Sequence, residues 1–390
     1  MMHEFKPSRG KFFWAACVCT ALLSACSPGQ IFAPAPTVPV AVLDQDQIFA
    51  LIGQGVSQAD LQKAAQAGGY ELLKRESLAG LGLELLTYRM PQGVTGAQAI
   101  AYLEAAEPGA TVGVNHAFHP VDQPGNAGPH YAAAVLNWPQ AGCRAQAPVG
   151  IIDTGVDPKA SALAAARVVN KDFTQGRAPD PRHGTEIAAV LANPQLLTNV
   201  TLYSAAVVRQ GPEGQGAAGA DAILRAIDWL EASGVRLVNI SLAGPYNKLL
   251  SRAVAAAEEK GLRIVAAVGN AGPRAKPLYP AAFPNVIGVT AIDARGRVYS
   301  QANRGDYVDV AAPGVDVFVE LGAGSRFVSG TSIAAPYVTA RILADPSLAQ
   351  SEDIEALRSG LQAGVEDLGA PGIDPVYGAG LPRFKAGCTD

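Results

Sequence analysis

Two short runs of apolar residues each end in a polar side chain. Residues 149–152 are apolar and mostly β-branched, and Asp153 follows them directly. Residues 264–268 form a run of the same kind that leads, through a glycine, to Asn270. Uniformly apolar runs of this length predict strands buried on both faces, as in parallel sheets. Because open α/β sheets form their sites at the carboxyl ends of strands, we expect Asp153 and Asn270 to lie in a site.

Two helices are expected, and each starts close to a polar residue. Residues 186–192 form a good helix-forming run just after His183. An alanine-rich run begins at Ser332, after Gly330 and Thr331. The amino end of a helix disfavours the imidazolium cation, which helps to keep a histidine neutral, and it offers N–H groups to an oxyanion. His183 and Ser332 are therefore candidates for a general base and a nucleophile.

Each of these features has an ordinary structural explanation when taken alone. Asp153 could cap a loop, and Asn270 beside a glycine could be a turn residue. His183 could be a surface histidine with its hydrogen bonds satisfied. The other four histidines all precede Asp153, so histidine chemistry within the C-terminal two-thirds of the chain requires His183. These four are His3, His116, His119 and His130.

The order Asp153, His183, Asn270 and Ser332, each in its local motif, resembles that of the subtilisin-like serine proteases. Aspartate, histidine and serine follow one another in this order in subtilisin. The resemblance covers roughly residues 130–385. Other segments that carry it are 237–244, 279–289, 308–315 and 377–381. The resemblance implies a subtilisin-like, three-layer α/β domain with a mainly parallel central sheet.

The resemblance assigns a role to each of the four side chains. Ser332 would attack a peptide carbonyl, His183 would pass the serine proton to the leaving amine, and Asp153 would orient the imidazole. Asn270 and the backbone N–H of Ser332 would hold the oxyanion. The implied activity is that of a serine endopeptidase, which acts on protein or peptide substrates and requires no cofactor.

Substrate contacts are also implied by the resemblance. Residues 237–244 are similar to the strand that forms one wall of the primary specificity pocket; its substrate-facing part is Ser241, Leu242, Ala243 and Gly244. Gly214 and its neighbours would supply an edge strand that pairs with extended substrate. Leu278 would lie near the pocket floor and shorten the pocket. We therefore expect a preference for small or medium apolar residues before the cleaved bond.

Two positions depart from the family pattern. Ala189 stands where the helix after His183 usually carries a glycine. The wall strand reads Leu-Ala-Gly at residues 242–244 where the family reads Leu-Gly. Neither change removes a catalytic group, so both concern the shape of the pocket and not the reaction.

The first 25 residues have the anatomy of an export signal. Basic residues precede an apolar stretch, residues 12–23, that is too short to span a bilayer. Small residues then precede Cys26, as at a bacterial lipoprotein cleavage site. The resemblance implies removal of residues 1–25 and lipidation of Cys26, which would anchor the protein to a membrane of the bacterial cell envelope as a periplasmic or outer-membrane lipoprotein. An ordinary export signal is the alternative.

The cysteine count agrees with export. Cys17 and Cys19 lie in the signal and Cys26 is the expected lipidation site, which leaves Cys143 and Cys388. An even pair in an oxidising compartment can form a disulfide. Two buried free thiols are the alternative.

Residues 41–118 are expected to form a small separate domain. The pattern predicts a strand at 47–52, a helix capped by Ser57 and ended by Gly68-Gly69, two strands between 70 and 90 broken at Ala79-Gly80, a helix at 94–106 and a strand at 111–118. This β-α-β-β-α-β order resembles the family's ferredoxin-like propeptide, an intramolecular inhibitor whose last segment occupies the active cleft. A permanently attached accessory domain is the alternative.

The expected organisation of the chain follows from these segments. Residues 1–25 are the signal, 26–40 a proline-rich tether, 41–118 the propeptide-like domain, 119–130 a linker and 131–390 the catalytic domain. A cut in the linker would release the catalytic domain from its anchor.

Charge and composition exclude some functions and leave others open. The 30 Lys and Arg residues and 34 Asp and Glu residues nearly balance and form no basic cluster, so nucleic acid is not an expected partner. No CxxC or HExxH motif supports zinc chemistry. The family often binds calcium, but no acidic cluster identifies a site, and structural calcium stays open. Two other interpretations are a catalytically silent relative that binds peptides in the envelope and a structural lipoprotein that only shares the fold.

Overall fold

The computed structural model describes most of the chain after residue 41. The signal, the tether and most of the linker lie outside the described residues, as do Cys26 and Gly214. The described residues are 42–53, 55–120, 123–124, 131–174, 180–210, 216–322, 324–384 and 388. No helix in these ranges has both the length and the apolar character needed to cross a membrane.

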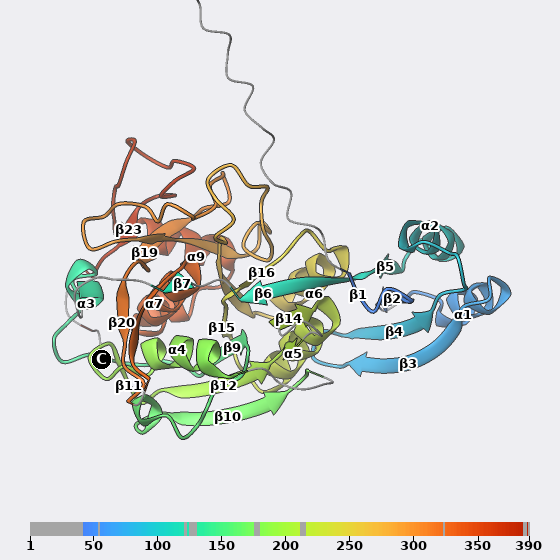
Figure 1. The fold of residues 1–390 in the computed structure, drawn as a ribbon, viewed down its shortest axis with the longest axis horizontal. Coiled ribbons are helices and arrows are strands. Elements are labelled where there is room, and N and C mark those ends of the chain that lie inside the picture. Colours follow the sequence, from blue (N-terminus) through green and yellow to red (C-terminus); the bar gives the residue numbers. More distant parts are fainter. Residues whose placement is uncertain are drawn as a thin grey trace, which may run out of the picture. The chain divides into compact units, whose positions relative to one another are not determined.

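The N-terminal domain contains a four-stranded antiparallel sheet and two helices (Figure 1). In chain order its elements are β2 (Gln47–Ile52), α1 (Gln58–Ala67), β3 (Glu71–Leu78), β4 (Leu83–Arg89), α2 (Gly96–Ala106) and β5 (Thr111–Gly113). The strands lie in the order β3–β4–β2–β5, which is the ferredoxin-like arrangement. The predicted succession of strands and helices is confirmed.

Local signals set the ends of the two helices. The Ser57 hydroxyl accepts a hydrogen bond from a backbone N–H of the first turn and begins α1, and Gly68 ends it, as predicted. Thr95 and Gln98 form a capping box. The second helix therefore begins at Gly96, two residues later than predicted.

Both faces of strand β2 are buried. Along β2, Ile48, Ala50 and Ile52 share an apolar cluster with residues of α1 and α2. Phe49 and Leu51, which point to the opposite face, belong to a cluster made mostly of residues from the C-terminal domain. The strand is apolar from Ile48 to Ile52 because each face packs against a different partner.

The strand predicted at 111–118 is two strands in two different sheets. One is β5, and the other, β6 (Asn115–Pro120), pairs with strands of the C-terminal domain. The buried amide of Asn115 donates to Asp44 (3.1 Å) and to Asp221 (2.8 Å), which holds the chain at the point where it changes sheet. Both halves are extended and mix apolar residues with polar ones, so the sequence pattern does not mark the change.

The C-terminal domain is built on a seven-stranded parallel sheet. In order across the sheet its strands are β10 (Arg167–Asp172), β12 (Thr201–Ala206), β9 (Val149–Asp153), β15 (Leu237–Ile240), β17 (Arg263–Ala267), β18 (Ile287–Ile292) and β19 (Val310–Pro313). Each neighbouring pair is parallel. The predicted apolar strands correspond to β9 and β17.

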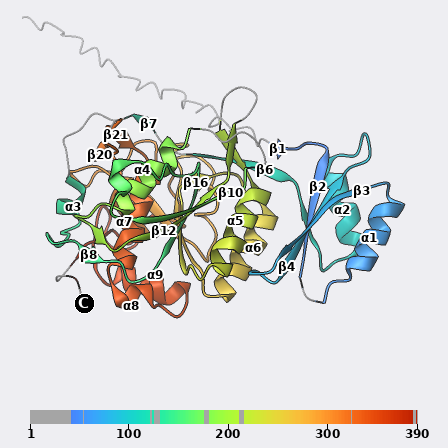
Figure 2. The ribbon, with the colours of Figure 1, turned by 90° about the horizontal axis from the view of Figure 1, so that it is seen from below.

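Helices cover both faces of this sheet (Figure 2). Those that share a cluster with Ile152 of β9 are α5 (Ala220–Ala232) and α6 (Lys248–Glu259). Those that share a cluster with the preceding residue, Ile151, are α4 (Arg182–Leu191), α7 (Thr331–Leu343) and α9 (Ile354–Gln362). Consecutive residues of one strand thus belong to opposite layers, as expected for a three-layer α/β domain.

Shorter elements complete the described part of the chain. They are β1 (Val42–Leu43), β7 (Gln123–Pro124), α3 (Tyr131–Val135), β8 (Cys143–Arg144), a 3-10 helix (Ser161–Leu163), β11 (Leu197–Thr198), β13 (Val208–Gln210), β14 (Gly216–Gly219), β16 (Leu242–Ala243), β20 (Val317–Val319), β21 (Arg326–Ser329), α8 (Pro346–Ala349), β22 (Val365–Glu366) and β23 (Leu381–Pro382). A disulfide joins Cys143 to Cys388, whose Cα atoms are 5.4 Å apart. It connects the segment just before β9 to the segment around residue 388.

Candidate active site

Asp153 and His183 form a buried hydrogen-bonded pair. Asp153 ends β9 and is 1% exposed. Its Oδ1 lies 2.7 Å from Nδ1 of His183 and also accepts the N–H of Thr154. An ionised carboxylate only accepts hydrogen bonds, so the proton between the two groups belongs to Nδ1. Nε2 of His183 then carries the lone pair, as a general base requires.

His183 lies within the first turn of α4, because this helix begins one residue before it and not after it as predicted. The amino end of α4 packs closely on the turn that follows Asp153. A side-chain carbon at Gly184 would lie 2.1 Å from the carbonyl oxygen of Gly155. The N–H of Gly184 donates to Thr154 Oγ1 at 3.0 Å. This close approach, which only glycine permits, brings the imidazole to the carboxylate.

Ser332 lies in the first turn of α7 and is fully buried. Helix α7 packs against α4 and against β15, β17, β18 and β19 of the central sheet. The residues that contact its first turn, Ser241 and Gly269, follow the carboxyl ends of β15 and β17. His183 and Ser332 thus occupy the amino ends of two adjacent helices at the edge of the sheet where sites form.

Asn270 is oriented by the residue that precedes Ser332. Its Oδ1 accepts hydrogen bonds from the backbone N–H (3.1 Å) and the hydroxyl (2.9 Å) of Thr331. Two donors on Oδ1 assign the other end of the amide as Nδ2, which is turned away from Thr331. The amide nitrogen is therefore the group that can donate to a developing oxyanion.

A second asparagine, which the sequence analysis missed, supports the loop around Asn270. Asn303 is fully buried, and its Oδ1 accepts the N–H of Ala271 at 2.8 Å. Its Nδ2 donates to the carbonyl of Lys276 at 3.1 Å. No motif marks Asn303 in the sequence, because its role depends only on what it meets in the fold.

The predicted wall strand lies beside a strand of the N-terminal domain. In β16, Leu242 and Ala243 pair with Pro120 and His119 of β6, in antiparallel register. On the other side, β14 pairs with β6 as well. Gly214 itself is outside the described residues, but β14 begins two residues after it. Leu278 packs against the backbone of Gly269. A side-chain carbon added to Gly269 would lie 2.5 Å from Cδ1 of Leu278.

A sequence profile of the subtilase family, Peptidase_S8, matches residues 145–380 of this chain. The chain belongs to the subtilase family. The match contains the residues predicted to form the site, from Asp153 to Ser332, and the whole central sheet.

Curated relatives align with the same region of this subtilase. It is 30% identical to the minor extracellular protease Epr of Bacillus subtilis, in an alignment that covers 62% of this chain and 38% of Epr. It is 34% identical to a thermophilic serine proteinase of Bacillus sp. strain AK1, over 49% of each protein. Subtilisin DY of Bacillus licheniformis is 32% identical over 61% of the chain and 89% of its own length. The chain thus spans half or less of the first two relatives.

Solved structures give the same fold. Fervidolysin of Fervidobacterium pennivorans superposes with a TM-score of 0.69 at 20% identity, over 88% of this subtilase and 61% of fervidolysin. The S41 psychrophilic protease superposes with a TM-score of 0.56 at 27% identity, over 67% of this chain and all of its own. The architecture is therefore subtilisin-like.

An ion pair with a buried carboxylate, which sequence analysis also missed, connects α4 of this subtilase to β21, the strand that precedes α7. Glu186, one turn after His183 in α4, is fully buried. Its carboxylate binds the guanidinium of Arg326 through two hydrogen bonds of 2.6 and 3.1 Å. Arg326 begins β21, which leads to Ser332. The pair thus links the helix that carries His183 to the strand that precedes Ser332.

Within the described residues, no three His, Cys, Asp or Glu side chains are grouped as ligands for a metal ion.

Replacing Arg326 with glutamine should destabilise the fold, because it leaves the Glu186 carboxylate buried without its cation. We expect the free energy of unfolding to fall by about 3 kcal/mol, the low end for a broken buried pair. Urea unfolding in a Ser332→Ala background, which prevents self-digestion, measures the change.

Two variants control this prediction. Arg326→Gln with Glu186→Gln should recover at least half of the loss, because no buried charge remains. Arg297→Gln, which removes an exposed pair with Asp293, should cost less than about 1 kcal/mol. Equal losses for Arg297→Gln and Arg326→Gln would contradict the structural role of the Glu186 pair.

Proposed function

We propose that this subtilase is a serine endopeptidase that works through Asp153, His183 and Ser332. The observation that carries the proposal is the buried 2.7 Å hydrogen bond between Asp153 and His183, with His183 and Ser332 at the amino ends of adjacent helices. The names of the curated relatives, which include proteases and subtilisins, support the same reaction.

The proposed reaction passes through an acyl-enzyme. Ser332 Oγ attacks the peptide carbonyl while His183 Nε2 takes the hydroxyl proton. Asp153 accepts from Nδ1 and stabilises the imidazolium that forms. His183 then gives its proton to the amine, which leaves as the peptide C–N bond breaks. Water, deprotonated by the same imidazole, releases the acyl group in a second round.

Charge on the former carbonyl oxygen would be held by two donors. One is the Asn270 amide nitrogen, whose direction Thr331 fixes, and the other is the N–H of Ser332 at the start of α7. Both are positioned before the reaction, so no reorganisation energy is spent when the charge appears.

We further propose that the N-terminal domain is a propeptide that inhibits the site. Strand β6 lies between β14 and β16, as an extended substrate would. After β6, Gln123 and Pro124 pair with β21, the strand that leads to Ser332. The chain therefore pairs with strands before and after the position of attack. The bond cut on maturation would lie between Pro120 and Gln123.

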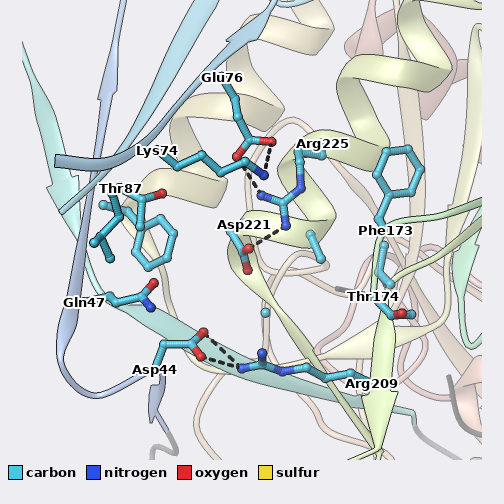
Figure 3. A pocket seen from close by; sticks show the side chains of 15 residues that line it. Asp44, Gln47, Lys74, Glu76, Thr87, Phe173, Thr174, Arg209, Asp221 and Arg225 are labelled. Atoms are coloured by element: carbon cyan, nitrogen blue, oxygen red, sulfur yellow. Dashed lines mark hydrogen bonds and ion pairs between the residues drawn. The ribbon is translucent and has the colours of Figure 1, made fainter. Parts of the chain in front are cut away.

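Ion pairs between the two domains support this role (Figure 3). Asp44 binds Arg209 at 3.0 Å, and Glu76 binds Arg225 at 3.2 Å. Figure 3 shows the Arg225 guanidinium between Glu76 of the N-terminal domain and Asp221 of α5. The N-terminal member of each interdomain pair is acidic and the C-terminal member basic, so the contact is electrostatically complementary.

A carboxylate of the C-terminal domain also holds the β3–β4 hairpin. Asp228 in α5 accepts the N–H of Leu81 at 3.2 Å. Burial at the contact raises the pKa of Asp228 above its usual value, and the backbone hydrogen bonds oppose this only in part. Glycine at position 80 allows the approach, since a side-chain carbon there would meet the Asp228 carbonyl.

We propose that the protein is exported and held in the bacterial cell envelope by lipid on Cys26. The basic and apolar segments of residues 1–25 and the small residues before Cys26 support this location. A cut between the domains would then free the catalytic domain from the anchor.

Loss of the nucleophile or of the oxyanion donor should abolish or reduce peptide hydrolysis. We expect Ser332→Ala to lower kcat by at least about 10⁴-fold. Asn270→Leu should lower kcat by about 100- to 1,000-fold, the usual effect of removing one oxyanion donor. Initial rates on casein and labelling by a fluorophosphonate probe measure both.

Ser359→Ala, which changes an exposed serine of α9, is the matched control and should keep full activity. If Ser332→Ala matched wild type on casein, the catalytic assignment would be wrong. An unlabelled wild type, freed of its N-terminal domain, would instead indicate a silent peptide-binding relative.

Radiolabelled palmitate should follow the N-terminal domain and not the catalytic domain. In wild-type cells we expect a small labelled fragment and an unlabelled catalytic fragment whose first residue lies between positions 121 and 123. Ser332→Ala should accumulate as a labelled, uncut chain, and Cys26→Ala should carry no label. Label on Cys26→Ala would exclude lipidation at this cysteine, and a normal cut in Ser332→Ala would exclude self-processing.

The proposed primary pocket should be limited by Leu278. Wild type should prefer small or medium apolar residues before the cleaved bond, as measured with a peptide library. Leu278→Gly should raise kcat/KM for phenylalanine at this position by about tenfold, because the removed side chain frees volume. Leu278→Met, which conserves volume, is the control. A wild-type profile dominated by Arg, Lys or Phe would contradict this pocket.

A further inference from the structure

Helix α7 has an interruption in its hydrogen bonding just after Ser332. In an α-helix the carbonyl of each residue accepts the N–H of the residue four positions later. For Ser332 that residue is Pro336, which has no N–H. The helix itself therefore cannot supply the usual donor to the carbonyl of the nucleophile.

Ser241 supplies a donor to this carbonyl from the central sheet. Its hydroxyl lies 2.9 Å from the carbonyl oxygen of Ser332, and both residues are fully buried. Ser241 directly follows β15, so its backbone belongs to the rigid edge of the sheet. An unsatisfied carbonyl at this depth would cost about 1–3 kcal/mol, which this hydrogen bond prevents.

The direction of this hydrogen bond is set by Asn239. The amide nitrogen of Asn239 donates to Ser241 Oγ at 2.9 Å, so the hydroxyl accepts there and its own proton is available to Ser332. Asn239 Oδ1 lies 3.1 Å from the hydroxyl of Thr339, two turns along α7 from Ser332. This chain of hydrogen bonds therefore connects Thr339 of α7, through Asn239 and Ser241 of the central sheet, to Ser332 of the same helix.

All four residues of this chain are fully buried: Thr339, Asn239, Ser241 and Ser332. A buried polar chain is stable only when its members are satisfied, and then it selects a single arrangement of the groups around it. Here the selected arrangement is that of the first turn of α7. The residue before Ser332 is separately held by Asn270. The nucleophile is thus fixed through the backbone on both sides.

We propose that Ser241 is a positioning residue for the nucleophile. It replaces the helical hydrogen bond that Pro336 removes, and so sets the direction of the Ser332 side chain and of the oxyanion N–H. This inference rests on the proposed protease function. It also gives the Ser241 side chain a role different from lining the specificity pocket, because its hydroxyl is directed at α7.

A double-mutant cycle on Ser241 and Pro336 tests the proposal. We expect Ser241→Ala to lower kcat by about tenfold with KM within twofold, because substrate contacts persist while the carbonyl of Ser332 loses its donor. Pro336→Ala restores an N–H at the helical position. Relative to Pro336→Ala alone, adding Ser241→Ala should therefore lower kcat by only about threefold, which is less than the tenfold loss that Ser241→Ala causes when Pro336 is present. Rates on a chromogenic peptide and thermal unfolding are measured for each protein.

Further variants separate positioning from a general loss of stability. Ser204→Ala, a buried serine of β12, is the matched control and should keep kcat. Ser241→Thr keeps the hydroxyl and should retain kcat within about threefold. If Ser241→Ala does not fold, Ser241→Cys, with its weak donor, should give the same fall in kcat and the same recovery by Pro336→Ala.

The outcomes distinguish this inference from the proposed function. Three results would overturn the positioning role while hydrolysis by wild type stands. They are an unchanged kcat in Ser241→Ala, an effect of Ser241→Ala confined to a higher KM, and equal losses of kcat from Ser241→Ala with and without Pro336. Absence of hydrolysis and of fluorophosphonate labelling in the processed wild type would overturn the protease function and this inference together.

Discussion

The hydrogen bond from His183 to Asp153 lies where water does not compete with it, and the other elements of the proposed active site are arranged around it. Because the carboxylate only accepts, the bond selects one imidazole tautomer and leaves Nε2 available for the proposed role of base. It also fixes the amino end of α4 to the carboxyl end of β9, where Gly184 lies against the next turn. A nucleophile can use this base only if α7 is held just as firmly, since small displacements weaken proton transfer.

Helix α7 is held by contacts of three kinds. Asn270 accepts from the residue before Ser332, Ser241 donates to the carbonyl of Ser332, and the Glu186 pair joins α4 to the strand that enters α7. All three contacts are polar, and the Ser241 contact is fully buried while the other two are partly buried, which makes each one costly to break and limits the alternatives open to the backbone. The interior of this subtilase thus contains polar contacts around Ser332 among its apolar side chains.

Sequence patterns predicted the local elements well. The strands at 47–52 and 149–152, the Ser57 cap and the amino-end position of Ser332 follow from apolar runs and capping residues, which act over a few positions. The prediction of one strand at 111–118 was wrong, because one strand and two successive strands fit the same sequence pattern. Residues 111–118 are extended throughout, yet they divide between two sheets, and the sequence pattern contains no sign of this division.

By itself, the sequence determined the succession of elements, the order of the candidate catalytic residues and the family, because these depend on near neighbours and on spacing. The tertiary structure alone decided that Ser241 serves Ser332, that Asn303 supports the Asn270 loop and that Glu186 meets Arg326. These partners are 91, 32 and 140 residues apart. Their side chains are ordinary serine, amide and charged groups. They have a role only because the packing of the sheet and helices determines which faces meet.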